Sequence, residues 1–154
     1  QQDGEQLDFR NDSFDLIICR GSLHHLPNPN KGLQEMHRVL AKGGELLISE
    51  PVSNLIVKSM RKVFYKKMDH FSGTHQSFTH KEFIDLLEEE KFVIEKKKYY
   101  GLLAFPFAYP DIISAFNHVP YIFPRALTSI DAVLLKVPIV RGFSFAYFVL
   151  AKKK

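Results

Sequence analysis

Phe14-Asp15-Leu16-Ile17-Ile18-Cys19 is a short, nearly continuous apolar run that lies between polar residues and Gly21. Runs of this kind are typical of strands buried on both faces of a parallel sheet. Leu46-Leu47-Ile48 is a second apolar run, and it ends at Ser49-Glu50-Pro51. The two runs therefore predict two neighbouring strands of one buried sheet.

The residues between these two runs predict a helix. Asn28 followed by Pro29 provides an N-cap and a first-turn proline. An apolar residue then recurs at helical spacing, at Leu33, Met36 and Leu40, and Gly43-Gly44 is predicted to end the helix. Strand, helix and strand with short links form a βαβ unit, whose strands are parallel and whose crossover is right-handed.

The rest of the chain predicts further helices and two more strands. Thr79-His80-Lys81-Glu82 has the spacing of a capping box, and Phe78 and Phe83 lie where a hydrophobic staple packs, so a helix is expected to start there. The other expected elements are helices at Ser53–Lys67, Asp111–His118 and Pro124–Val137, and strands that begin at Phe92 and span Phe143–Ala151. In the Pro124–Val137 helix, the side chains expected to face one way are Leu127, Ile130, Val133 and Leu134.

Composition limits the class of protein. The chain has 154 residues, 45% of them hydrophobic, and a net charge of +4, which fits one globular domain and requires no nucleic acid partner. No apolar stretch reaches the roughly 20 residues of a membrane-spanning helix. The single cysteine, Cys19, cannot form an internal disulfide and is expected to be a packed core thiol, so we expect a cytoplasmic protein. Because the chain begins on Gln1 without Met, we expect that its beginning is missing.

Four ordered segments resemble one protein family. They are Asp3-Gly4-Glu5-Gln6-Leu7-Asp8-Phe9, Ser13 to Ile18, Leu23-His24-His25-Leu26-Pro27 and Glu35 to Gly44. In this order and with these gaps, they resemble the middle motifs of class I S-adenosylmethionine-dependent methyltransferases, in the broad branch that includes the quinone-biosynthesis methyltransferases. The resemblance is specific from Asp3 to Pro51 and looser beyond it.

The resemblance implies an α/β fold, the C-terminal part of a Rossmann-like methyltransferase sheet. The retained strands would be ordered 4-5-7-6, with the last strand antiparallel and a helical insert between the last two strands. The chain would be one partial domain. Residues 1–101 would form the βαβ core with the elements that follow it, residues 102–142 the acceptor-side insert, and residues 143–154 the last strand and basic tail.

The resemblance also implies a cofactor, S-adenosyl-L-methionine, and residues that contact it. Those residues are Asp3, Gly4, Glu5, Arg20, Gly21 and His25. The Asp3 carboxylate would accept a hydrogen bond from the adenine amino group, the Gly4 amide would donate to a ring nitrogen, and Arg20 would hold the methionine part through its backbone. The alternative for Asp3 is a frayed terminal residue, and for Arg20 a solvated residue at a strand end.

Histidines are the candidates for further chemistry. His24 or His25 could act as a general base, although methyl transfer depends chiefly on proximity and orientation, so that a base matters only if the acceptor must lose a proton. Glu50 and His75 are candidates for the acceptor side. His70, His75 and His80 are spaced five residues apart, but no cysteine accompanies them, so no metal site is expected.

The family's glycine-rich cofactor loop does not occur in this sequence, which contains no G-x-G pattern. We therefore expect the apolar strand at Phe14–Cys19 to lack a neighbour and to pair with a missing upstream segment or with a second copy in a homo-oligomer. The expected function is methyl transfer to a small, hydrophobic acceptor, a lipid or aromatic molecule, as suggested by the aromatic insert at Leu102–Gly142. The alternative for these aromatic residues is that they only cover the sheet. The alternative to this function is a non-catalytic fragment or partner-binding module. Lys96–Lys98 and the basic tail allow either a weak peripheral membrane contact or a solvated basic face.

Overall fold

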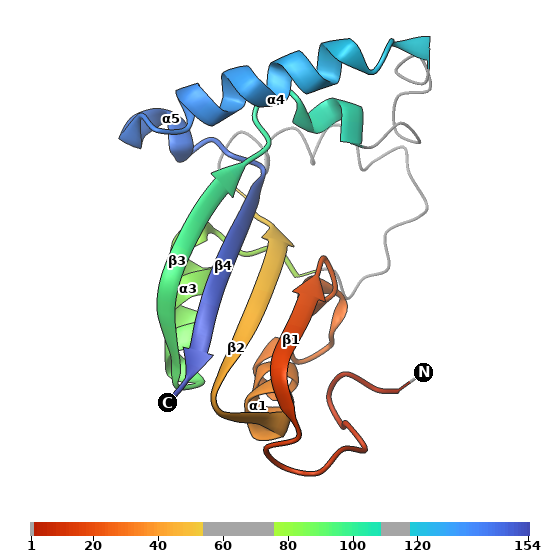
Figure 1. Ribbon diagram of the computed structural model, residues 1–154, viewed down its shortest axis with the longest axis vertical. Helices are drawn as coiled ribbons and strands as arrows, with labels where there is room; N and C mark the ends of the chain where they lie inside the picture. Colours follow the sequence, from red (N-terminus) through yellow and green to blue (C-terminus); the bar gives the residue numbers. More distant parts are fainter. Residues whose placement is uncertain (1, 54–75, 109–117) are drawn as a thin grey trace.

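The computed structural model describes residues 2–53, 76–108 and 118–154 (Figure 1). The strands are β1 (Phe14–Arg20), β2 (Leu40–Pro51), β3 (Phe92–Tyr100) and β4 (Ala146–Lys153). The α-helices are α1 (Pro29–Val39), α3 (His80–Glu89), α4 (Ile122–Leu134) and α5 (Pro138–Arg141), and two short 3₁₀ helices are η1 (Leu23–His25) and η3 (Phe105–Ala108). None of the helices in these ranges has the length and apolar content needed to cross a membrane.

The four strands form one open sheet in the order β1-β2-β4-β3. β1 and β2 are parallel, and β4 is antiparallel to both β2 and β3. The predicted α/β class, the parallel βαβ unit and a last strand inserted antiparallel beside the second are therefore confirmed. The numbers 4-5-7-6, which come from the family, stay a prediction.

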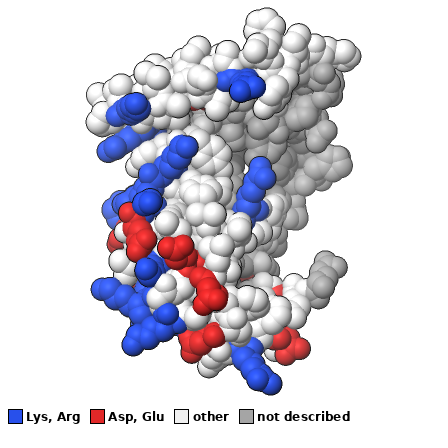
Figure 2. All heavy atoms as spheres, viewed as in Figure 1, with Lys and Arg blue, Asp and Glu red and all other residues white. Residues whose placement is uncertain are grey.

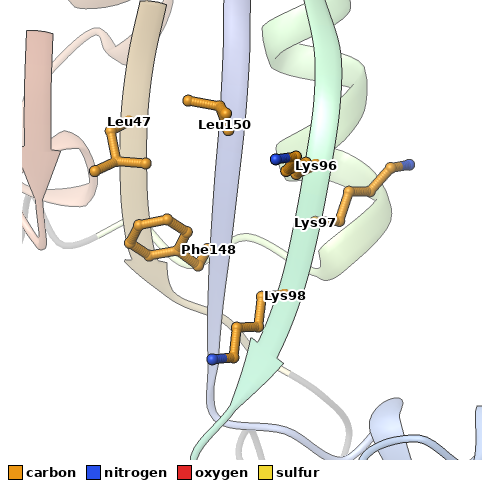
Figure 3. Close-up of a pocket in the computed structure, with 6 residues that line it drawn as sticks. All are labelled: Leu47, Lys96, Lys97, Lys98, Phe148 and Leu150. Atoms are coloured by element: carbon orange, nitrogen blue, oxygen red, sulfur yellow. The ribbon is translucent and has the colours of Figure 1, made fainter. Parts of the chain in front are cut away.

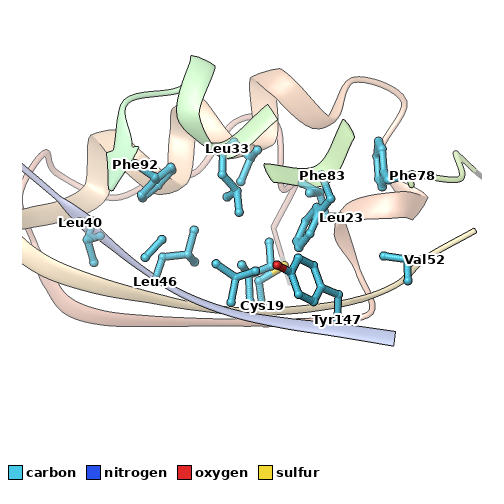
Figure 4. Close-up of a cluster of buried hydrophobic side chains, with 14 residues drawn as sticks. Cys19, Leu23, Leu33, Leu40, Leu46, Val52, Phe78, Phe83, Phe92 and Tyr147 are labelled. Carbon is cyan, nitrogen blue, oxygen red and sulfur yellow. The ribbon is translucent and has the colours of Figure 1, made fainter. Parts of the chain in front are cut away.

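The core lies between the sheet and two helices. α1 and α3 pack on one face of the sheet, and α4 crosses above the end to which β1, β2 and β3 point (Figure 1). Five of the fully buried side chains in this core are Leu33, Leu46, Ile48, Phe83 and Tyr147 (Figure 4). Burial of each such apolar side chain stabilises the fold by about 1.5–3 kcal/mol.

The start of α3 follows the sequence prediction. Thr79 Oγ1 accepts from the Glu82 amide at 3.2 Å, and the Glu82 carboxylate accepts from the Thr79 amide at 2.7 Å. The rings of Phe78 and Phe83 lie 6.3 Å apart, as a hydrophobic staple requires. The predicted helix start is confirmed.

The end of α1 differs from the prediction. The helix stops at Val39 rather than at Gly43-Gly44, because Leu40 already has an extended backbone with ψ of 134° and pairs with Phe14. Gly43, with φ of +79°, lies instead within β2. The apolar Leu40 thus belongs to the strand, although its spacing from Met36 fits a helix.

Three other expectations need correction or lie outside the described ranges. β1 is not buried on both faces, because Leu16 is 49% and Ile18 65% exposed. The last strand begins at Ala146, three residues later than predicted. The expected helices Ser53–Lys67 and Asp111–His118 lie, apart from Ser53 and His118, outside the described residues.

Candidate functional site

The carboxyl end of β1 forms an open turn. The Gly21 amide donates to the Ser49 carbonyl at 2.7 Å, which ties the turn to β2. Gly21 has φ of +58°, a conformation that favours glycine, and a Cβ built there would meet no atom within 4 Å. Because ligands of open α/β sheets bind beyond the carboxyl ends of the strands, this space beside Arg20 and Gly21 is the candidate ligand site.

A second turn, formed by Asp3 to Gln6, lies near the N-terminus of the chain. The Asp3 carboxylate accepts from the Glu5 amide at 2.9 Å, and Asp3 itself is exposed. Glu5 Oε1 accepts from the Asn28 amide at 2.6 Å, so this carboxylate anchors the turn to the start of α1. Asp3 therefore keeps an exposed carboxylate that can accept from a ligand, whereas Glu5 is engaged within the protein.

Leu26 connects the Asp3–Gln6 turn to the residues that follow β1. A Cβ on Gly4 would lie 3.1 Å from Leu26 Cδ2, and one on Gly32 only 2.3 Å from Leu26 Cδ1. The Leu26 side chain thus occupies the space that side chains at Gly4 and Gly32 would need. This contact packs the Asp3–Gln6 turn against the residue that follows η1.

Arg38 holds the segment that follows the Asp3–Gln6 turn. Its guanidinium donates to both carboxylate oxygens of Glu35 at 2.8 Å and to the backbone carbonyls of Leu7 and Phe9 at 2.8 and 2.7 Å. The Leu7 amide in turn donates to Glu35. The Arg38 hydrogen bonds lower the pKa of Glu35 to about 2. Sequence reasoning placed Arg38 only within a motif and missed this role.

The strongest polar cluster is centred on Glu50, near the end of β2. Its side chain is fully buried, and Oε1 accepts from the amides of Ser22 and Leu23 at 3.0 and 2.9 Å. Its Oε2 lies 2.6 Å from Nδ1 of His24, which is the donor because an ionised carboxylate only accepts. Glu50, expected on the acceptor side, therefore binds η1 and orients His24.

The two candidate bases lie together. The rings of His24 and His25 are 4.0 Å apart and tilted by 37°. The side chain of His24 is 13% exposed, and its backbone carbonyl accepts from the Gln76 amide at 3.0 Å. Glu50 thus holds the ring of His24 in one orientation.

Cys19 lies beside this cluster and is a core residue. Its sulfur is 3.2 Å from Ser22 Oγ and 3.9 Å from Glu50 Oε1. Burial raises the pKa of the thiol to about 11, so it stays protonated at neutral pH. The prediction of a packed core thiol is confirmed.

The insert is held to the sheet by one buried carboxylate. Asp131 of α4 is 3% exposed and accepts from the amides of Leu102, Leu103 and Ala104 at 2.9, 2.9 and 3.1 Å. It therefore ties α4 to the segment that leaves β3. One sign in the sequence indicates a special role for Asp131, since it is the only acidic residue between His118 and Ala151.

His80 belongs to an aromatic cluster near the same end of the sheet. Its Nε2 lies 2.8 Å from Ser144 Oγ, and its ring lies 5.1 Å from the rings of Tyr99 and Tyr147. Burial lowers the pKa of His80, and burial together with the Tyr99 hydroxyl raises that of Tyr147. His75 and His70 lie outside the described residues. Within the described ranges no three His, Cys, Asp or Glu side chains are grouped as metal ligands.

A surface hollow of about 560 Å³ lies on the sheet face opposite α1 and α3 (Figure 3). Leu47, Phe148 and Leu150 form its floor, and lysines of β3 form one side. Its lining comes from the middle of β2, β3 and β4, away from the turn after β1. The hollow is therefore a separate surface and not part of the candidate site.

The residues present fit a nucleoside-containing ligand in part. The open Gly21 turn leaves room for close approach of a ligand to the backbone, and Asp3 has an exposed carboxylate. The sequence supplies no glycine-rich loop and no acidic residue after it. The described residues could therefore form one side of a binding site, the side that contains the Gly21 turn and Asp3.

Comparisons with known proteins match the region that forms this site. Residues 1–48 match a family model described as a methyltransferase domain. The chain is 40% identical over 50 residues to 2-methyl-6-phytyl-1,4-hydroquinone methyltransferase 2, chloroplastic, of Oryza sativa subsp. japonica, an alignment covering 32% of this chain and 14% of that protein. It is 39% identical over 64 residues to the ubiquinone/menaquinone biosynthesis C-methyltransferase UbiE of Pectobacterium carotovorum subsp. carotovorum, covering 42% of this chain and 25% of that protein.

The fold is also found among solved structures. A SAM-dependent methyltransferase from Methanosarcina mazei superimposes with a TM-score of 0.60 and 19% identity, over 99% of this chain and 65% of that one. The alignments with the two sequence relatives span at most a quarter of those proteins. The likeness therefore supports the fold and the motifs near the candidate site.

Proposed function

We propose that this chain, which has the fold of class I S-adenosylmethionine-dependent methyltransferases and whose residues 1–48 match their methyltransferase domain, takes part in methyl transfer from S-adenosylmethionine to a small acceptor. One observation carries the proposal. The matched residues contain β1 with the Gly21 turn at its carboxyl end, the η1 segment that Glu50 binds, and the Asp3–Gln6 turn, which packs on Leu26 directly after η1. That end is where this class of sheet binds its ligands.

Each cofactor contact would come from a separate part of the site. The exposed Asp3 carboxylate would accept from the adenine amino group and the Gly4 amide would donate to a ring nitrogen, while Arg20 and Gly21 would contact the methionine part through the backbone. Glu5 would contribute indirectly, because its carboxylate holds the turn on Asn28. When bound, the cofactor supplies an electrophilic methyl group.

The acceptor would be oriented by the cluster of Glu50 and His24. Methyl transfer is an in-line displacement that depends on positioning of the two reactants. Because Nδ1 of His24 donates to Glu50, Nε2 is the ring nitrogen that can accept a proton. An acceptor hydroxyl would lose its proton to this atom, and an acceptor that is already nucleophilic would need only the orientation. His25, whose ring lies beside that of His24, would line the same pocket.

The acceptor would be small and hydrophobic. Two observations support this. The two sequence relatives reported above have names that refer to hydroquinone or quinone compounds. The sequence of residues 102–142 is rich in aromatic residues, and its described helices α4 and α5 lie above the end to which β1, β2 and β3 point (Figure 1). The division into a core at 1–101, this insert and a last strand with a basic tail at 143–154 belongs to the same proposal.

A complete cofactor site would need a further polypeptide segment. Among the described residues, β1 pairs only with β2, and its outer residues Leu16 and Ile18 are exposed. An apolar edge of this kind is a template for another strand. An upstream segment would pair with residues 14–19 and supply the glycine-rich loop. A second copy in a homo-oligomer could pair there as well, but it has the same sequence and brings no such loop.

The second candidate function is a partner-binding module that keeps the fold without binding the cofactor. The absence of a G-x-G pattern from the sequence favours it. Isothermal titration of the chain with S-adenosylmethionine, together with a thermal shift, separates the two. Binding that is weakened at least about tenfold in Gly21→Val, but not in the matched control Gly142→Ala, would support the cofactor site. No heat and no thermal shift at millimolar cofactor would contradict cofactor binding by the chain as given.

A further inference from the structure

α4, α5 and the turn between them expose a run of apolar side chains, which we name the insert patch. It consists of Ile122, Phe123, Ile130, Val133, Val137 and Ile139. Their exposed fractions run from 47% at Ile130 and Val137 to 80% at Ile139. The sequence pattern predicted that Ile130 and Val133 share one side of the helix, and the structure leaves both exposed. Asp131, buried under the amides of residues 102–104, sets the inward side of α4 instead.

The insert patch follows one side of α4. Ile122, Ala126, Ile130 and Val133 are separated by three or four residues, so they form a single stripe along the helix. The stripe continues past the end of α4 to Val137 and Ile139. Exposed stripes of this length are uncommon on monomeric soluble proteins and mark surfaces that contact a partner.

The charges around the insert patch all have one sign. Between residues 118 and 145 the basic residues are Arg125, Lys136 and Arg141, and all three are exposed. Asp131 is the only carboxylate in that range, and it is buried. In the space-filling view, the region that α4 and α5 occupy in Figure 1 is mainly white with blue groups, whereas the red groups gather lower on the molecule (Figure 2).

Two of the basic residues, Arg125 and Lys136, lie next to the stripe in the sequence. Arg125 lies within α4 directly before Ala126 of the stripe, and Lys136 lies in the turn between the end of α4 at Leu134 and the start of α5. Exposed basic side chains therefore accompany both the stripe and the turn that follows it. A helix with an apolar side and a basic edge lies in the plane of a membrane interface, where its apolar side enters the acyl boundary and its cations meet anionic headgroups.

We propose that the insert patch is a docking surface for an anionic lipid membrane, on which α4 and α5 lie flat. A second copy of the chain is a poorer occupant, because a symmetric contact would bring the basic edge of one patch close to that of the other. The proposal differs from a contact through Lys96–Lys98, which lie on β3. It does not depend on cofactor binding.

The test is co-sedimentation of the chain with vesicles, without cofactor. Vesicles of phosphatidylcholine with roughly one third phosphatidylglycerol should pellet the protein, pure phosphatidylcholine vesicles much less, and added salt should release it. Val133→Glu with Ile139→Glu should weaken binding at least about tenfold. Arg125→Gln with Lys136→Gln should weaken it roughly twenty-fivefold, since each basic side chain near such a surface contributes about fivefold.

The matched control is Lys96→Gln with Lys98→Gln, which removes two charges outside the insert patch and should leave binding within about twofold. Because all substituted side chains are on the surface, circular dichroism should show wild-type folding for each variant. The proposal is overturned if anionic vesicles do not pellet the chain or if the β3 variant loses binding as much as the patch variants. It is also overturned if light scattering shows a dimer that Ile139→Glu dissociates. Failure of cofactor titration alone would leave this result unchanged.

Discussion

Replacing Glu50 should destabilise the fold more than replacing any other polar side chain at the candidate site. Glu50→Ala removes the acceptor of the Ser22 and Leu23 amides and of His24 Nδ1, at 3.0, 2.9 and 2.6 Å. The Leu23 amide is buried, whereas the Ser22 amide and His24 Nδ1 are partly buried. A buried donor left without a partner costs about 1–3 kcal/mol, and a partly buried one costs less. With two amides unpaired and a small cavity left by the missing side chain, we expect a loss of about 3–5 kcal/mol in the free energy of unfolding.

Glu50→Gln removes the negative charge of the side chain but keeps its size and shape. The glutamine oxygen can still accept from both amides, but its NH₂ group cannot accept the proton of His24 Nδ1. The expected loss is about 1–2 kcal/mol, together with a change of the His24 tautomer. ¹⁵N-detected NMR of the imidazole nitrogens reports that tautomer, and urea unfolding followed by circular dichroism gives the free energies.

Glu45→Gln is the matched control in the same strand, since Glu45 is only partly buried. It should change the free energy of unfolding by less than about 0.5 kcal/mol. The reasoning is refuted if Glu50→Ala lies within about 1 kcal/mol of the parent chain, or if the His24 tautomer is the same in Glu50→Gln.

Three other results are expected. Arg38→Lys, which loses the paired contacts to Glu35, should speed hydrogen exchange of the amides around Leu7, and exchange there at the parent rate would contradict the role of Arg38. Burial lowers the folded-state pKa of His80 below its unfolded value near 6.5, so the stability that neutral His80 provides is complete above that pH and declines as the pH falls below it. Melting temperatures at about pH 7.5 and 5.5 should show a smaller decrease for His80→Gln than for the parent, and equal decreases would count against it. Cys19, with its pKa raised to about 11, should react with iodoacetamide at about pH 8 only after unfolding, so rapid labelling of the folded chain would be inconsistent with its burial.

Local chemistry explains which elements could be predicted. The start of α3 depends on Thr79 and Glu82, three residues apart, and both reciprocal hydrogen bonds are present. The βαβ unit likewise depends on short apolar runs and on the cap at Asn28, whose side chain accepts from the Lys31 amide. Contacts within a few residues were therefore readable from the sequence.

Long-range contacts explain what could not be predicted. Leu40 fits the helical spacing from Met36, but pairing with Phe14 places it in β2. Glu50 binds residues more than 25 positions earlier, and nothing in its neighbours indicates that its partners are two amides and an imidazole. The candidate site was located by the motifs, whereas the way its parts are held together needed the fold.

The packing of Leu26 against Gly4 and Gly32 has a consequence for how this sequence can change over evolution. A methyl group at Gly32 would lie 2.3 Å from the present position of Leu26 Cδ1, so alanine there requires Leu26 to move or to become smaller. A smaller Leu26 would in turn loosen the contact with Gly4 in the Asp3–Gln6 turn. Substitutions at these three positions should therefore arise together in lineages that keep the turn, as compensated sets rather than as independent changes.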